Sequence, residues 1–246
     1  MLLEQSEFLL LNSIWKFIII NSLKIDRNIN MFKYHILEIL KGIIMKESQY
    51  EELLNIKTTG EELWSEKIKH NHPYQATSYD ALEKLFENYI VNKDDYIVDF
   101  GCGKGRLNFY INYFFKANVT GVEMDRNYYE QCLINKENYL SKNKRKSSSI
   151  DFECCYAQEY KIKDYENKFY FFNPFSVVIF SKIIDNILDS YYNKIRKIEL
   201  ILYYPSQDYI YYLENSTPFT LKEEVILDYL YDSDTQERFL IYELAY

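Results

Sequence analysis

The sequence predicts an α/β fold with a seven-stranded, mostly parallel sheet, helices on both faces and an antiparallel hairpin at the carboxyl end. Three observations lead to this expectation. From about residue 95, short apolar runs alternate with segments of helical periodicity, as in β-α units with parallel strands. A glycine-rich loop directly follows the first run. The last two runs are joined by a short turn, so they are expected to pair antiparallel.

The elements are expected in the following order. Strands are predicted at about 95–100, 118–124, 149–157, 168–175 and 198–205, and the closing pair at 224–232 and 237–245 around a turn at 233–236. Helices are predicted at about 82–90, 106–117, 125–140 and 181–195. Thr77 and Ser78 are residue types that cap helices, and Asp80 follows Thr77 at the spacing of a capping box.

The composition is that of a globular protein. Of the 246 residues, 48% are apolar and only 6 are glycine, which argues against a disordered chain. The net charge of -8 speaks against a nucleic-acid partner, because phosphate backbones attract basic surfaces. The 4 cysteines and 3 histidines show no metal-ligand spacing, so we expect reduced thiols and no metal.

The amino-terminal part is expected to be a helical extension over residues 1–72, followed by one domain over 73–246. Residues 8–20 are strongly apolar, but the run is too short for a membrane helix of about 20 residues and contains Lys16. The residues before it are acidic, unlike the start of a secretory signal. We therefore expect a cytoplasmic protein without stable membrane insertion.

The glycine loop is the strongest functional signal. In YIVDFGCGKGR, residues 96–106, Gly101, Gly103 and Gly105 come directly after the strand. Glycines permit a sharp turn and let a ligand approach the main chain closely. The loop lies at the carboxyl end of a strand, where open α/β sheets bind ligands. The dinucleotide fingerprint has its third glycine one residue later, so the spacing differs from that of a dehydrogenase.

Taken together, four features resemble the class I S-adenosylmethionine-dependent methyltransferases, which have a Rossmann-like sheet. They are the loop Asp99–Gly105, Glu123 closing the second strand in TGVEMD, the segment FFNPF at 171–175, and the antiparallel ending. The resemblance covers roughly residues 75 to 246. A dehydrogenase would explain the loop and Glu123, but not the segment at 171–175 or the final hairpin.

The resemblance implies S-adenosyl-L-methionine as cofactor and a role for particular residues. Asp99 would organise the loop, and Glu123 would accept hydrogen bonds from both ribose hydroxyls. After the third strand, where many relatives have an acid facing adenine, this sequence has Tyr156. The expected cofactor-binding residues are Tyr79, Asp99, Gly101, Cys102, Gly103, Glu123, Met124, Ala157 and Gln158.

The substrate side is expected at Asn173, Pro174 and Phe175, where the fourth strand ends. An asparagine oxygen and a proline carbonyl can accept hydrogen bonds from an amine, and a phenylalanine ring can form a wall. Relatives that act on adenine or glutamine amides have (N/D)PP(F/Y), one proline more than this chain. Alternatively, the segment is a turn that ends a buried strand.

Three functions remain open from the sequence. The first is methylation of a nitrogen in a protein or small molecule. The second is adenine-N6 methylation of RNA or DNA, which predicts a basic surface near the pocket. The third is a non-catalytic cofactor-binding protein of the same fold. Lys104 and Arg106 are expected to be surface charges.

Overall fold

A computed structural model describes residues 45–60, 75–87, 89–143 and 148–244. The chain divides into two compact units, residues 1–49 and 50–246, and the description below concerns the second. The predicted extension over 1–72 lies largely outside the described residues. Helix α3 (Glu47–Leu54) falls within that range, but the proposed domain boundary after residue 72 remains a prediction.

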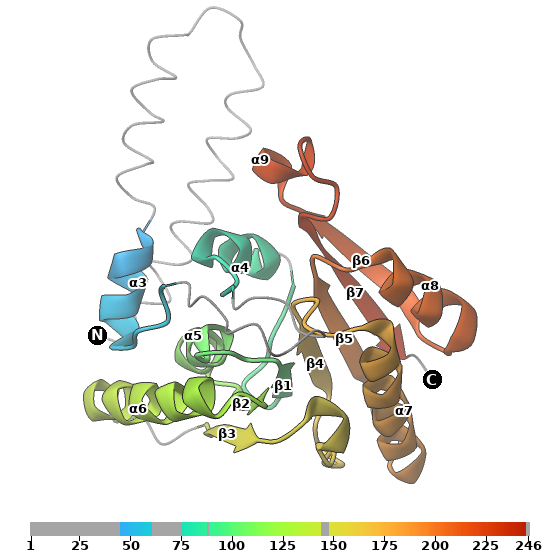
Figure 1. Ribbon diagram of the computed structural model, residues 1–246, viewed down its shortest axis with the longest axis horizontal. Helices are drawn as coiled ribbons and strands as arrows, with labels where there is room; N and C mark the ends of the chain where they lie inside the picture. The colour runs from blue at the N-terminus through green and yellow to red at the C-terminus, as the bar shows by residue number, and fades with distance from the viewer. Residues whose placement is uncertain (1–44, 61–74, 88, 144–147, 245–246) are drawn as a thin grey trace, which may run out of the picture. The chain divides into compact units, whose positions relative to one another are not determined.

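The sheet has seven strands in the order β3-β2-β1-β4-β5-β7-β6 (Figure 1). Strands β1 to β5 are parallel, and β7 lies antiparallel between β5 and β6. The predicted fold class is confirmed. The bounds are β1 Tyr96–Phe100, β2 Asn118–Glu123, β3 Ile150–Cys154, β4 Lys168–Phe171, β5 Ile198–Tyr203, β6 Thr220–Ile226 and β7 Arg238–Leu244.

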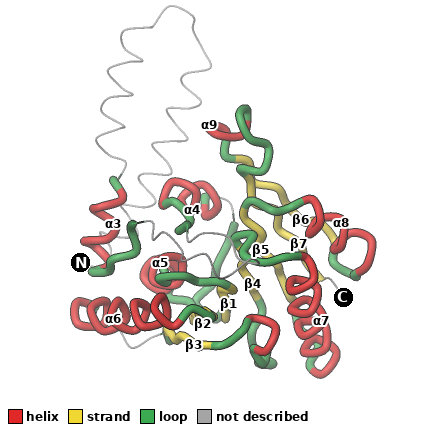
Figure 2. The backbone as a smooth tube through the Cα atoms, in the orientation of Figure 1, coloured by secondary structure: helices red, strands yellow, loops and turns green. Residues whose placement is uncertain are grey.

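Helices cover the sheet on both sides. Helices α5 and α6 follow β1 and β2 and pack on one face, while α7 and α8 lie on the other (Figures 1 and 2). The bounds are α4 Tyr79–Phe86, α5 Arg106–Phe115, α6 Arg126–Lys142, α7 Val177–Asn193, α8 Gln207–Ser216 and α9 Asp228–Tyr231, with a 3₁₀ turn at Ala157–Glu159.

Aromatic side chains form the core between the sheet and α7 and α8. Phe100 of β1 stacks on Phe171 of β4 with ring centroids 5.2 Å apart. Phe180 of α7 stacks on Tyr209 of α8 at 3.8 Å. Strands buried on both faces are apolar at nearly every position, which explains why the central strands could be predicted from short apolar runs.

The start of α4 differs from the predicted capping box. Ser78 is the N-cap, and its hydroxyl accepts a hydrogen bond from the Ala81 N–H at 3.2 Å. The Thr77 hydroxyl instead bonds the Tyr170 hydroxyl of β4 at 2.7 Å. The capping box at Thr77 is therefore wrong, because Thr77 is buried beside β4 and has a partner there.

The closing strands are confirmed as an antiparallel pair, but the predicted strand at 224–232 is wrong in its second half. Strand β6 ends at Ile226, and Leu227 is the N-cap of the short helix α9. The N–H groups of Leu230 and Tyr231 both donate to the Leu227 carbonyl at 2.8 and 2.9 Å. Leu227, Leu230 and Tyr231 have helical spacing, but residues 225–231 are apolar at every position except Asp228. Such a short apolar run also fits a buried strand, so the pattern did not distinguish the two.

Helix α8 was not among the predicted elements. Ser206 caps it, accepting from the Tyr209 N–H at 3.3 Å, and Asp208 stands in its first turn. These signals are present in the sequence.

The four cysteines form no disulfide. No helix in the described parts of the chain is long and apolar enough to cross a membrane, and those parts contain no metal-ligand cluster of three His, Cys, Asp or Glu.

Candidate active site

The glycine loop connects β1 to α5 through three left-handed residues. The φ angles of Gly101, Gly103 and Gly105 are 78°, 55° and 84°, a region that side chains disfavour. The N–H groups of Gly101 and Cys102 both donate to the Val122 carbonyl of β2, at 2.9 and 3.2 Å. These bonds bring the start of the loop to the carboxyl end of the second strand.

Glu123 lies at that strand end and is bonded to the loop. Its Oε2 accepts from the Gly103 N–H at 2.9 Å, and its Oε1 accepts from the Asp125 N–H at 2.8 Å. Burial raises the pKa of Glu123 from 4.5 to about 7, although these backbone hydrogen bonds favour the charged form. The Met124 N–H also hydrogen-bonds this carboxylate. A carboxylate has about four acceptor sites, so these three bonds leave about one for a ligand.

Asp99 is a second buried carboxyl group at the same edge. Burial and the Glu123 carboxylate together raise the pKa of Asp99 well above 3.8. The Asn108 amide of α5 satisfies both neighbours when its nitrogen faces Asp99, with 2.9 Å to Oδ2 and 3.2 Å from the Gly121 N–H to its oxygen. Two neighbouring buried carboxyl groups create a site that favours a cationic ligand.

The Asn173-Pro174-Phe175 segment reaches the same loop from β4. Asn173 has a φ of 40°, a left-handed conformation that is uncommon outside glycine. A Cβ placed on Gly101 would lie 2.9 Å from Pro174 Cβ. Tyr209 holds Phe175, because its hydroxyl donates to the Phe175 carbonyl at 2.6 Å. The structure therefore brings the glycine loop, Glu123 and this segment to one edge of the sheet.

The remaining predicted positions near this edge come from β2 and β3. Met124 directly follows Glu123. The last residue of β3, Cys154, is in register with Glu123, and Ala157 is buried in the 3₁₀ turn that follows β3. The Gln158 carbonyl accepts from Asn186 Nδ2 of α7 at 2.9 Å. Their contacts with a cofactor remain predictions.

Cys102 lies inside the loop, next to Cys132 of α6. Cys102 is buried, and burial raises the pKa of its thiol well above 9.0. The Cys132 thiol donates to the Gly103 carbonyl at 3.0 Å. Both thiols therefore support the loop from within, and the contact of Cys102 with a cofactor stays a prediction.

Tyr79 is engaged in a buried cluster. Its hydroxyl donates to Glu51 Oε1 at 2.8 Å, and its ring stacks on Tyr50 at 4.3 Å. The Arg106 guanidinium lies over the ring at 4.6 Å from its centroid. The proposed role of Tyr79 in cofactor binding stays a prediction.

Lys104 and Arg106 are not surface charges, contrary to the prediction. Their exposed fractions are 4% and 5%. Arg106 Nε donates to Thr58 Oγ1 at 2.8 Å, Nη1 donates to the Thr77 carbonyl at 3.3 Å, and Nη2 lies 3.8 Å from Glu51 Oε1. The sequence pattern missed this burial because the partners of Arg106 lie far upstream.

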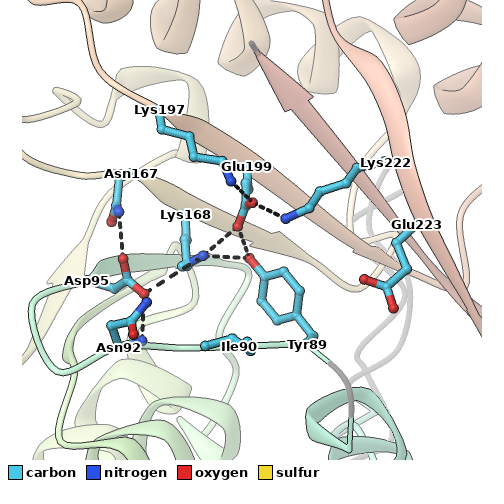
Figure 3. Close-up of a pocket in the computed structure, with 10 residues that line it drawn as sticks. All are labelled: Tyr89, Ile90, Asn92, Asp95, Asn167, Lys168, Lys197, Glu199, Lys222 and Glu223. Atoms are coloured by element: carbon cyan, nitrogen blue, oxygen red, sulfur yellow. Dashed lines mark hydrogen bonds and ion pairs between the residues drawn. The ribbon is translucent and has the colours of Figure 1, made fainter.

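A cavity of about 550 Å³ lies at the opposite edge of the sheet, where the parallel strands begin (Figure 3). Glu199 at its centre accepts hydrogen bonds from Tyr89 at 2.6 Å and Lys222 at 2.5 Å, and it pairs with Lys168 and Lys197 at 2.5 and 2.9 Å. The other lining residues are Ile90, Asn92, Asp95, Asn167 and Glu223. This cavity shares no lining residue with the glycine-loop site, and its polar groups largely bond one another.

The strand order with its single antiparallel strand is that of the class I methyltransferases, so the chain has the class I methyltransferase fold. No family model matches the sequence, and neither does any curated protein.

Solved structures resemble the chain at low identity. An RNA methyltransferase from Salinibacter ruber in complex with S-adenosyl-L-homocysteine is 12% identical, with a TM-score of 0.48 over 69% of this chain and 92% of that one. A protein of the NADB-Rossmann superfamily from Streptococcus agalactiae is 16% identical, with a TM-score of 0.46 over 69% and 68%. TrmK from M. capricolum, in complex with S-adenosyl-homocysteine, is 14% identical, with a TM-score of 0.42 over 69% and 68%. All three TM-scores are below 0.5, so the fold is assigned from the strand order of this chain and not from these structures.

The glycine loop yields a stability prediction. Gly105→Ala should cost about 2–5 kcal/mol, because it combines left-handed strain of about 1–2 kcal/mol with overpacking of about 1–3 kcal/mol. A Cβ there would lie 2.9 Å from the Phe152 ring. Gly60→Ala is the control, since Gly60 has a φ of 99° but no atom of the described residues would lie within 4 Å of its Cβ. Urea unfolding measures both, and equal losses would show that the contact with Phe152 is unimportant.

Proposed function

We propose that this chain is an S-adenosyl-L-methionine-dependent methyltransferase that methylates a nitrogen of a protein or small molecule. The observation that carries the proposal is the convergence at one edge of the sheet. Glu123 is bonded to Gly103 at 2.9 Å, and Pro174 packs against Gly101 of the same loop. These segments carry three of the four features in which the sequence resembles the family.

The residues at this edge fit such a cofactor. Gly101 is exposed and has no Cβ, so a ligand can approach the main chain there. The remaining acceptor site of the Glu123 carboxylate can accept a hydrogen bond from a ribose hydroxyl. Asp99 and Glu123 together favour a positively charged group, because a cation offsets the repulsion between two buried carboxylates.

When bound, the cofactor supplies an electrophilic methyl group on a sulfonium. The protein's own contribution is to orient the acceptor and exclude water, and such positioning supplies much of the rate. The Asn173 side-chain oxygen and the Pro174 carbonyl would accept hydrogen bonds from the acceptor nitrogen. Phe175, held by Tyr209, would form a wall of the site.

Replacing Glu123 tests the cofactor side. Glu123→Ala should weaken S-adenosylhomocysteine binding about ten- to a hundred-fold, because charge-assisted hydrogen bonds contribute about 1.5–3 kcal/mol. Titration calorimetry measures the affinity, and circular dichroism checks that the variant is folded. Unchanged affinity would mean that Glu123 does not contact the ligand.

The pH dependence should show the protonation of Glu123. The carboxylate accepts hydrogen bonds better than the carboxylic acid, so affinity should fall as the pH drops from 8 to 6, through the pKa of about 7. The sign for stability is opposite. The pKa of Glu123 is 4.5 in the unfolded chain and about 7 in the folded protein, so the folded protein binds more protons between pH 4.5 and pH 7. Glu123 therefore lowers the stability of the free protein as the pH rises from 4.5 to 7.

Glu123→Gln removes this titration and is the matched control. In that variant, the affinity for S-adenosylhomocysteine should be low and nearly independent of pH between 6 and 8. A pH dependence as steep as that of the wild type would assign the titration to another group.

A further inference from the structure

Residues 51–58 are joined by side-chain hydrogen bonds to the end of the glycine loop, and we call them the support segment. Leu54 and Thr58 are fully buried, each with an exposed fraction of 0%. The segment belongs to the same compact unit as the loop. It is separated from the loop by more than 40 residues of chain, so its contacts with the loop arise from the tertiary fold.

Asn135 of α6 joins the support segment to the loop. Its Oδ1 accepts from the Lys57 N–H at 2.9 Å, and its Nδ2 donates to the Lys57 carbonyl at 3.2 Å. The same Nδ2 donates to the Lys104 carbonyl at 3.1 Å. Asn135 is only 3% exposed, so water cannot readily replace these bonds. One side chain therefore fixes the main chain of both segments.

Arg106 makes the second connection, at the end of the loop. Its Nε donates to the Thr58 hydroxyl at 2.8 Å, and that hydroxyl donates to Glu51 Oε1 at 2.5 Å. The Thr58 N–H also donates to the Glu51 carboxylate at 2.5 Å. The guanidinium is buried and its charge is balanced by Glu51. The support segment thus holds the first residue of α5, which directly follows Gly105.

A loop with three glycines loses much conformational entropy when it is ordered. If the free protein already holds the loop in its bound form, a ligand does not pay this cost, and its affinity is higher. From the bonds to Lys104 and Arg106, we propose that the support segment and Asn135 position the glycine loop for the cofactor. This inference rests on the proposed function, because it assigns the loop a cofactor.

The chain offers a matched control for Asn135. Asn112 of α5 is 6% exposed, and its Nδ2 donates to the Ala117 and Ser149 carbonyls, both at 3.1 Å. Its Oδ1 accepts from the Tyr139 hydroxyl at 2.9 Å. The two asparagines are alike in burial and in bonding, but the bonds of Asn112 join the far end of α5 to β3 and α6. Asn112→Ala should therefore destabilise the fold without loosening the loop.

The experiment compares Asn135→Ala and Asn112→Ala in the full chain. Both variants should lower the thermal midpoint by similar amounts. Asn135→Ala should weaken S-adenosylhomocysteine binding at least ten-fold, whereas Asn112→Ala should change it less than three-fold. Equal affinity losses in the two variants, or no loss in either, would overturn the proposal. In that case Asn135 would stabilise the fold as Asn112 does and would have no specific effect on the loop.

Hydrogen exchange without ligand is the second readout. The Gly103 N–H donates to Glu123 and the Gly105 N–H donates to the Cys102 carbonyl at 2.9 Å. Asn135→Ala should accelerate exchange of these two amides at least ten-fold relative to Asn112→Ala. Equal exchange rates would contradict the proposal. If the wild-type protein does not bind S-adenosylhomocysteine, the proposed function fails, while the exchange rates still decide whether the segment orders the loop.

Discussion

Asn173→Ala is expected to lower methyl transfer by about 10²-fold or more while leaving the affinity for S-adenosylhomocysteine within a few-fold. The side-chain oxygen of Asn173 is proposed to orient the acceptor nitrogen, and a misplaced nucleophile loses the in-line geometry of the transfer. Asn173 follows β4, while the proposed ribose contact, Glu123, ends β2, with β1 between them. Transfer of a labelled methyl group into an extract of cells lacking the gene measures the activity.

Asn173→Gly separates the side chain from the backbone. Alanine at a φ of 40° should cost about 1–2 kcal/mol of stability, whereas glycine adopts this conformation freely. The glycine variant should therefore keep the wild-type thermal midpoint and lose the same activity as the alanine variant. Full activity in the folded glycine variant would remove Asn173 from the active site and favour a strand-ending turn.

Glu199→Gln should be the most destabilising substitution of the opposite edge, at about 3–5 kcal/mol. Removing one partner of a buried ion pair leaves the other charge uncompensated. Lys168 is 6% exposed. Without the Glu199 carboxylate, it would keep its hydrogen bond to the neutral Tyr89 hydroxyl and a distant ion pair with Asp95, at 3.8 Å. Glu243, the register partner of Glu199 on β7, is the control. Its pair with exposed Lys197 spans 3.6 Å, and Glu243→Gln should cost less than about 1 kcal/mol.

Acid should remove the same stabilisation. Burial alone would raise the pKa of Glu199, but the hydrogen bonds from Lys168, Lys222 and Tyr89 hold it well below 4.5. Since the folded pKa is depressed, the stability that Glu199 contributes is present above pH 4.5 and is lost as the pH falls below it. Urea unfolding at pH 7 and pH 3.5 should show a smaller loss in Glu199→Gln than in the wild type. An identical loss would contradict this role for Glu199.

The sequence predicted the sheet and the segments of the site because their signals are local. The loop at 101–105 needs left-handed residues, and glycines supply them within five positions. Glu123 and Asn173 follow apolar runs that could be recognised as strands, so strand order alone predicts that they lie at one edge. That edge is where the structure has them.

The supporting contacts could not be predicted in this way. Arg106 follows the loop and has the pattern of a solvated helix residue, and only the tertiary fold brings Thr58 and Glu51 to it. The same holds for Asn135, whose partners lie at Lys57 and Lys104. Partners so distant in sequence leave no periodic signal, so a buried polar network is identified only from the structure.

Calorimetric titration of the wild-type protein with S-adenosylhomocysteine and with NAD is the most direct test of the proposed function. Both ligands carry an adenosine whose ribose Glu123 could bind, so the ribose contact alone does not separate them. A class I methyltransferase site, with Asp99 and the Asn173-Pro174-Phe175 segment beside the loop, would favour S-adenosylhomocysteine over NAD. We predict binding of S-adenosylhomocysteine with a dissociation constant in the micromolar range or below, and no measurable binding of NAD. Tight binding of NAD and none of S-adenosylhomocysteine would contradict the proposal.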